Sequence, residues 1–196
     1  SLALLFFLPF FSLIVTAGYA EENVWGHLIS TVMPGYLKNT FWLMLGVGSG
    51  TLLLGVSSGW LISMTEFPGR RIMEWALLLP MAFPGYIIAM VYVELLEYSG
   101  PVQAQIRLWF GWHNFQDYWF PQITSVGGAV TMLSLVLYPY VYLLARIAFL
   151  QQPATLLEAS RMLGKSSRNS FLHVSLPLAR PAIVVGVSLA MMETLA

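Results

Sequence analysis

The sequence has 196 residues, of which 58% are hydrophobic and only 9% charged, and its formal net charge is zero. Soluble domains carry about 25% charged residues, so this composition excludes an ordinary soluble domain and predicts a membrane protein. The balanced charge offers no basic region for nucleic acid. The absence of cysteine excludes disulfides, thiolate metal sites and cysteine nucleophiles from these residues.

Long apolar runs predict about five membrane-spanning helices, because a bilayer core requires about 20 largely apolar helical residues. The predicted spans are about 2–20, 40–64, 73–94, 122–145 and 181–196. The last run is too short to cross, and the first residue is not methionine. We therefore expect a fragment cut at both ends, with all of 1–196 in one all-α transmembrane domain.

The first run has two interpretations. Gly18-Tyr19-Ala20 would serve as a signal-peptide cleavage site after an apolar core. The run is long, however, and no basic leader is visible, although truncation would remove one. We favour a retained first span over a cleaved signal peptide.

Four glycines mark the second span. Gly46 and Gly50 form one small-xxx-small pair, and Gly55 and Gly59 form another. Such residues let two helix backbones approach closely in lipid. They predict either a seam between subunits or packing within one subunit, and we favour packing within the subunit.

Prolines interrupt the third span at Pro80 and Pro84, and Gly85 follows directly. We expect this helix to be kinked or locally unwound. A broken helix could line a pathway through the membrane, so Pro80 and Pro84 are candidate path residues. Ordinary structural kinking is an equally good explanation.

The loop at 95–117 predicts a short helix that starts at Pro101. Its apolar stripe of Val102, Ile106, Trp109 and Phe110 would lie in the membrane interface. An aromatic belt is expected from Trp109, Trp112, Tyr118 and Trp119. 

No candidate catalytic or metal site emerges from the sequence. The three histidines, His27, His113 and His173, have no carboxylate or histidine cluster at metal spacing. No Walker glycine loop and no nucleophile–base constellation is present. We therefore predict a protein that is not an enzyme and that holds no cofactor.

A polar, basic segment at 151–180 separates the last two spans and predicts two short helices joined at Gly164. Pro153 suits the first turn of the first helix, whereas Thr155 with Glu158 is an alternative capping-box start. Gly164 suits a left-handed helix cap. Ser166 or Ser167 could cap the second helix. A short amphipathic helix at a membrane surface is suited to enter a partner's groove.

The order of residues in this segment is Glu158-Ala159-Ser160, three residues, Gly164, nine residues, Val174, one residue, and Leu176-Pro177. It resembles the EAA loop of bacterial ABC-importer permeases. Ser160 replaces the second alanine of that pattern and Val174 replaces its isoleucine. The resemblance implies a type I permease helical bundle whose loop docks into a cytoplasmic ATP-binding subunit, with Glu158 the principal contact.

Lysines and arginines support the same orientation, since they concentrate on the cytoplasmic side of membrane proteins. Seven lie inside when the loop is cytoplasmic: Arg70, Arg71, Arg146, Arg161, Lys165, Arg168 and Arg180. Only Lys38 and Arg107 lie outside.

Shorter stretches narrow the resemblance. The sequences YLKNT at 36–40, TEFPGRR at 65–71, LLLPMAFPGYIIA at 77–89, YSGP at 98–101 and METLA at 192–196 are similar to iron(III)-importer permeases. Thiamine, polyamine and sulfate permeases share this layout and are alternatives. The resemblance implies alternating access in a bacterial inner membrane, with a periplasmic binding protein and a second permease half, fused or separate.

Glu193 is the one acidic residue expected near mid-membrane. An unpaired charge there costs at least ~2.5 kcal/mol, so it should face a partner or a watery cavity. It could give iron(III) an oxygen ligand along the path, or accept hydrogen bonds from a neighbouring span, which we favour. A secondary transporter or channel is the alternative class, and a membrane enzyme a remote third.

Overall fold

A computed structural model describes residues 28–164 and 166–195. The predicted first span, its alternative cleavage site, His27 and Lys165 lie outside these residues. The chain divides into two units, 1–41 and 42–196. In the first unit, a π-helical turn, η1 (Leu28–Val32), leads into the start of α3 (Met33–Met64). The rest of α3 belongs to the second unit.

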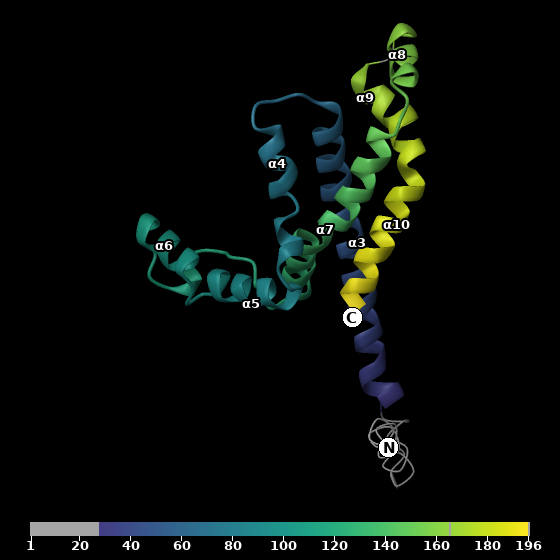
Figure 1. The fold of residues 1–196 in the computed structure, drawn as a ribbon. Helices are drawn as coiled ribbons and strands as arrows, with labels where there is room; N and C mark the ends of the chain where they lie inside the picture. The colour runs from purple at the N-terminus through teal and green to yellow at the C-terminus, as the bar shows by residue number, and fades with distance from the viewer. Residues whose placement is uncertain (1–27, 165, 196) are drawn as a thin grey trace, which may run out of the picture. The chain divides into compact units, whose positions relative to one another are not determined.

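The described residues are helices and loops, without a strand, as expected for an all-α membrane protein (Figure 1). The second unit continues with α4 (Arg70–Ala76), η2 (Leu79–Ala82), α5 (Gly85–Leu96), α6 (Pro101–Phe110), η3 (Phe115–Asp117), α7 (Val126–Leu150), α8 (Ala154–Met162), α9 (Ser167–Ser170), η4 (Phe171–Ser175) and α10 (Leu176–Leu195).

Three helical stretches are long and apolar enough to cross a membrane: Ile29–Met64, Val126–Leu150 and Ser167–Leu195. A fourth span results if Arg70–Ala82 and Gly85–Phe110 count as one, although these two limbs meet at 97°. The described residues thus hold three or four candidate spans. The total of five stays a prediction, because the run at 2–20 lies outside these residues.

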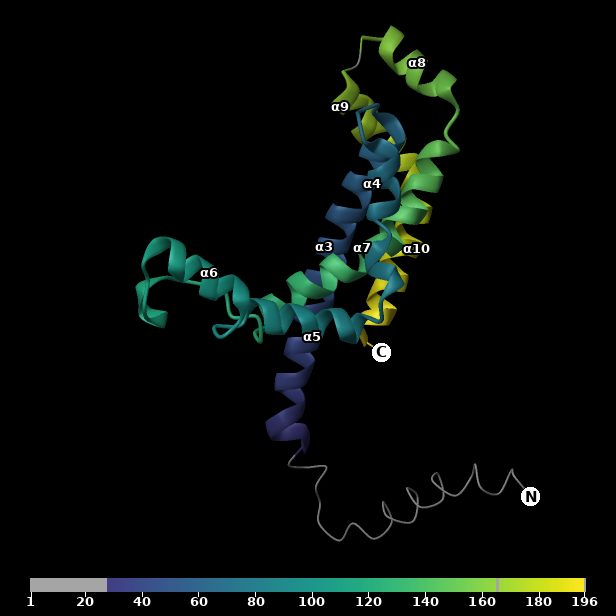
Figure 2. The same ribbon diagram turned by 60° about the vertical axis from the view of Figure 1, so that its left-hand side comes forward.

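Helix α7 lies between α3 and α10, and glycines on both neighbours make this packing possible. A Cβ added at Gly55 of α3 would lie 2.5 Å from Cβ of Val141, and one added at Gly186 of α10 would lie 2.9 Å from Cα of Val141. Figures 1 and 2 show α7 and α10 running side by side. The core around Val141 includes Ala145 and Ile183.

The other three glycines of the two predicted pairs also face α7. A Cβ at Gly46 would lie 2.7 Å from the Val130 methyl groups, and a Cβ at Gly59 would lie 3.3 Å from the backbone N of Arg146. A Cβ at Gly50 would collide with the Ser134 side chain. The prediction that this glycine series packs within the subunit is therefore confirmed.

The third predicted span is broken, as its prolines indicate. Phe83 is extended at φ −117° and ψ 141°, because the residue before a proline is driven out of the α region. Helix α5 starts directly after Pro84. The predicted kink is confirmed.

Three polar contacts hold α4 and the turn that follows it against α7. The Tyr138 hydroxyl donates to the carbonyl oxygen of Leu77 at 2.8 Å. The Tyr142 hydroxyl donates to the carbonyl of Glu74 at 3.3 Å, and the Glu74 carboxylate forms an ion pair with Arg146. The first limb of the broken span is thereby fixed to the helix that leads into the loop.

The loop at 95–117 folds on itself. Helix α6 begins at Pro101, as predicted, and its buried Gln103 accepts a hydrogen bond from the Tyr118 hydroxyl at 2.6 Å. Trp109 is exposed, whereas the rings of Trp112 and Tyr118 stack with centroids 5.0 Å apart. Two of the four residues of the predicted aromatic belt therefore serve the internal packing of this loop.

A carboxylate organises the end of the same loop. Asp117 accepts hydrogen bonds from the backbone N–H groups of Asn114 and His113, at 2.8 and 2.9 Å. These bonds lower the pKa of Asp117 below its usual range, because they stabilise the charged form.

Candidate functional site

Helix α8 is the first helix of the predicted loop. It begins at Ala154, and the Leu156 N–H donates to the carbonyl of Pro153 at 3.1 Å. The start is thus next to Pro153, and the alternative capping-box start at Thr155 is wrong. Pro153 thus directly precedes the helix, one position before the first turn in which it was predicted.

Gly164 ends this helix in the left-handed conformation that the sequence predicts, with φ 77°. A Cβ added there would meet no described atom within 4 Å. Glycine is therefore required by the backbone conformation and not by crowding.

Ser166, and not Ser167, caps the next helix. Its Oγ accepts a hydrogen bond from the N–H of Asn169 at 3.4 Å. From Ser167 the helical path runs without a break through α9, η4 and α10 to Leu195. The helix that contains the predicted last span thus starts well before Pro181.

A π-helical turn makes this continuity possible. The N–H of Leu176 donates to the carbonyl of Phe171, and Pro177 follows directly. In a regular α-helix the proline ring would clash with the carbonyl four residues earlier. The wider turn relieves that clash.

Ser160, where the EAA pattern has alanine, is buried and faces Ser170. Their hydroxyl oxygens are 2.6 Å apart, and both side chains are at most 5% exposed. This bond joins α8 to α9. The departure from the pattern therefore has a structural partner within the loop.

The remaining motif residues divide between the surface and the base of the loop. Glu158 and Ala159 are exposed on α8, whereas Val174, Leu176 and Pro177 are half-buried. At the end of α8, Met162 is 90% exposed and Leu163 is 81% exposed. The loop thus presents a carboxylate and two large apolar side chains to its surroundings.

Sequence reasoning missed the contacts that anchor the loop. The Phe171 ring lies 4.9 Å from the Trp60 ring of α3 and 6.1 Å from the Phe149 ring of α7. Gln152 Nε2 donates to the Ser175 carbonyl at 2.8 Å. No local sequence pattern predicts contacts between residues so far apart in the sequence.

The candidate path residues lie on other elements. Glu193 is exposed on α10 and has no hydrogen bond or ion pair with any described residue. Pro80 lies in η2, and Pro84 precedes α5.

Comparison with known proteins identifies the architecture. Residues 51–196 match the family described as binding-protein-dependent transport system inner membrane component. The chain belongs to this family. It is a multi-pass membrane protein, and the resemblance of its loop to ABC-importer permeases is confirmed.

Three relatives give the range of similarity. A molybdenum transport system permease protein of Escherichia coli (strain K12) is 27% identical over 74% of this chain and 60% of its own length. A probable sulfate transport system permease protein of Nephroselmis olivacea is 32% identical over 70% of this chain and 45% of its own. A sulfate transport system permease protein of Escherichia coli (strain K12) is 30% identical over 70% and 44%.

The permease spans about 60% or less of the length of these relatives. Their names refer to molybdenum and sulfate, so the narrower resemblance to iron(III) permeases gains no support from them.

Proposed function

We propose that the permease is part of the membrane subunit of an ATP-driven importer, and that α8 docks into a separate cytoplasmic ATP-binding subunit. The observation that carries this proposal is the EAA-type order of residues folded as a short exposed helix closed by a left-handed glycine. The exposed Met162 and Leu163 supply apolar surface for a groove, and Glu158 supplies a charge.

The contacts at the base of the loop support a mechanical role. The Ser160–Ser170 bond joins α8 to α9, and α9 continues into α10. The Phe171 ring packs on α3 and α7. Closure of the ATP-binding subunits would therefore move α8 and the spans as a rigid body.

ATP can shift the inward–outward equilibrium only if its binding differs between the two states. The contact through α8 must differ accordingly, and we assign this difference to Glu158. A periplasmic binding protein would deliver substrate to the opposite face, and a second permease half would complete the path.

Docking is tested by Gly164→Leu, compared with Gly164→Asn, since asparagine tolerates the left-handed region. Leucine there costs roughly 1–2 kcal/mol in backbone strain and displaces α8. We expect Gly164→Leu to insert normally, to lose most of the co-purified ATP-binding subunit and to abolish transport, whereas Gly164→Asn retains both. If Gly164→Leu binds the ATP-binding subunit and transports normally, α8 is not the docking helix.

For the substrate we propose an inorganic oxyanion such as sulfate or molybdate, because the relatives are named for sulfate and molybdenum. Iron(III) is the second candidate, from the similar stretches in the sequence. Glu193 distinguishes them: a carboxylate in the path attracts a hard cation and repels an oxyanion.

Uptake of labelled sulfate, molybdate and iron(III) into vesicles with the assembled transporter tests this choice. We expect uptake of an oxyanion, and Glu193→Gln to leave its rate unchanged because Glu193 then lies off the path. Iron(III) uptake that falls at least about tenfold in Glu193→Gln, a loss of about 1.4 kcal/mol, would reverse the order and place Glu193 on the path.

A further inference from the structure

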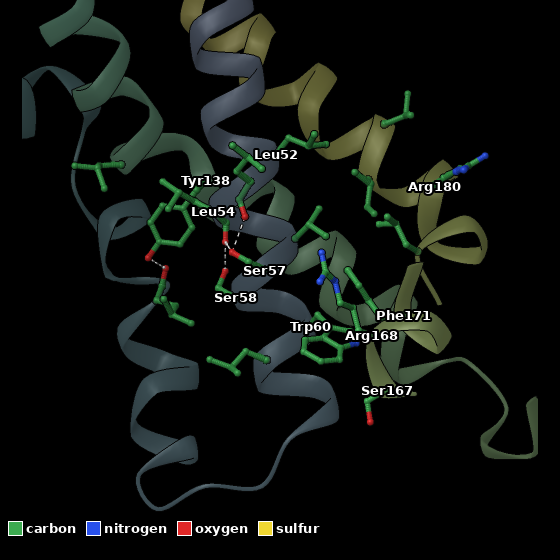
Figure 3. A pocket seen from close by; sticks show the side chains of 18 residues that line it. Leu52, Leu54, Ser57, Ser58, Trp60, Tyr138, Ser167, Arg168, Phe171 and Arg180 are labelled. Carbon is green, nitrogen blue, oxygen red and sulfur yellow. Dashed lines mark hydrogen bonds between the residues drawn. The ribbon is translucent and has the colours of Figure 1, made fainter. Parts of the chain in front are cut away.

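A large apolar groove opens beside α3 and α10. Leu176 of the EAA pattern lines it, whereas Glu158, Gly164 and the candidate path residues do not. Its volume is about 1250 Å³, and its walls include Leu53 and Leu61 of α3, Tyr138 of α7, and Ile183 and Val184 of α10. We call it the α3–α10 groove (Figure 3). Because its helices are membrane-spanning candidates, hydrocarbon is the surrounding solvent.

The charged side chains of this groove are of one sign. Arg168 of α9 and Arg180 of α10 line it, and no acidic residue does. Figure 3 shows Arg168 beside Phe171, with its guanidinium directed toward α3, whereas the Arg180 side chain at the edge points away from Arg168. Glu74 and Arg146 form the one ion pair among the described residues. Neither Arg168 nor Arg180 therefore has a carboxylate partner among them.

We propose that the α3–α10 groove binds an anionic glycerophospholipid, with its phosphate at Arg168, an acyl chain along the leucine-lined wall, and Arg180 adding positive charge at the edge of the groove. A free inorganic anion would use the arginines but not the apolar wall. A neutral lipid would use the wall but leave both cations without a counter-charge. Basic pockets between membrane helices are established sites for anionic headgroups.

Such a lipid would brace the loop. Arg168 follows Gly164 by four residues, and Phe171 packs on Trp60, which also lines the groove. A phosphate at Arg168 would therefore hold α9 against the inner end of α3. The proposal depends on neither the substrate nor the ATP-binding subunit.

The test uses Ser57→Cys in the assembled transporter, labelled with bimane and compared with the unsubstituted transporter as labelling background. Ser57 lines the groove and is exposed, and these 196 residues contain no cysteine. Phosphatidylcholine vesicles would contain equal mole fractions of acyl-brominated phosphatidylglycerol or acyl-brominated phosphatidylcholine. Quenching then reports which lipid occupies the groove.

We expect phosphatidylglycerol to be preferred about fivefold for each arginine. Arg168→Gln and Arg180→Gln should each lower the preference by about fivefold, and raised salt should weaken it. Arg71→Gln, on the same predicted side but outside the groove, is the matched control and should leave the preference unchanged.

Equal quenching by both lipids would show ordinary bilayer contact. Absence of quenching by either would show a protein segment over the groove. Either result would overturn the proposal.

Discussion

The hydroxyl pair of Ser160 and Ser170 is the residue-level feature that most distinguishes this loop. Both groups are buried, and each satisfies the other. Removing one partner leaves a buried hydroxyl without its bond, which costs about 1–3 kcal/mol, whereas removing both costs less.

We therefore expect Ser160→Ala and Ser170→Ala each to lower the Tm of the purified permease, and the double variant to be less destabilised than the sum. The coupling free energy should be about 1 kcal/mol. Ser188→Ala is the control, since that exposed hydroxyl bonds only the Val184 carbonyl of its own helix. Strictly additive effects would mean that the pair contributes nothing to stability.

At this scale, the sequence predicts the conformation of residues whose type strongly favours one backbone position. Gly164 was expected in a left-handed cap because few other residues enter that region, and a serine was expected to cap the following helix. The bond between Ser160 and Ser170 could not be foreseen. It depends on α9 folding back beside α8, which no local pattern specifies.

At the scale of elements, α7 packs closely against both α3 and α10, and glycines at both contacts make this possible. Gly55 of α3 and Gly186 of α10 allow two backbones to approach Val141. Close approach gains dispersion contacts, which drive helix association in lipid, where hydrophobic burial does not.

Gly55→Ala should therefore separate α3 from α7, because its methyl group would lie 2.5 Å from Cβ of Val141 and 2.8 Å from the backbone N of Tyr142. Overpacking of this kind costs about 1–3 kcal/mol, measured as a lower Tm in detergent. Gly127→Ala is the control, since its Cβ would have an ordinary contact of 3.8 Å with Ser125. Equal Tm values for the two variants would contradict this close packing of α3 against α7.

Element boundaries were less predictable than element types. The break near Pro84 followed from proline chemistry, but its angle of 97° did not. The last helix was expected to begin at Pro181 and instead includes Pro177 and Pro181, because a π-helical turn accommodates the first proline. Proline predicts a disturbance and does not specify how the helix absorbs it.

At the scale of the whole molecule, charge and motif specify one orientation. Seven of nine basic residues are predicted to lie on the side of the EAA loop. Two sets of contacts link the helices near the loop. Glu74 of α4 pairs with Arg146 of α7, and the Phe171 ring packs on α3 and α7. Composition predicted the membrane class and the helical fold. Substrate identity was not predictable, because it depends on side chains that face the path and not on the shared packing pattern.

The most direct test of the account is photo-crosslinking from Met162, which is 90% exposed at the end of α8. A photoreactive amino acid at Met162 should crosslink to the ATP-binding subunit in the assembled transporter, and the yield should change when ATP binds. The matched control is Leu108, 75% exposed on the loop predicted to face outward, which should give no such product. A crosslink from Leu108 but not from Met162 would contradict both the docking of α8 and the orientation of the permease.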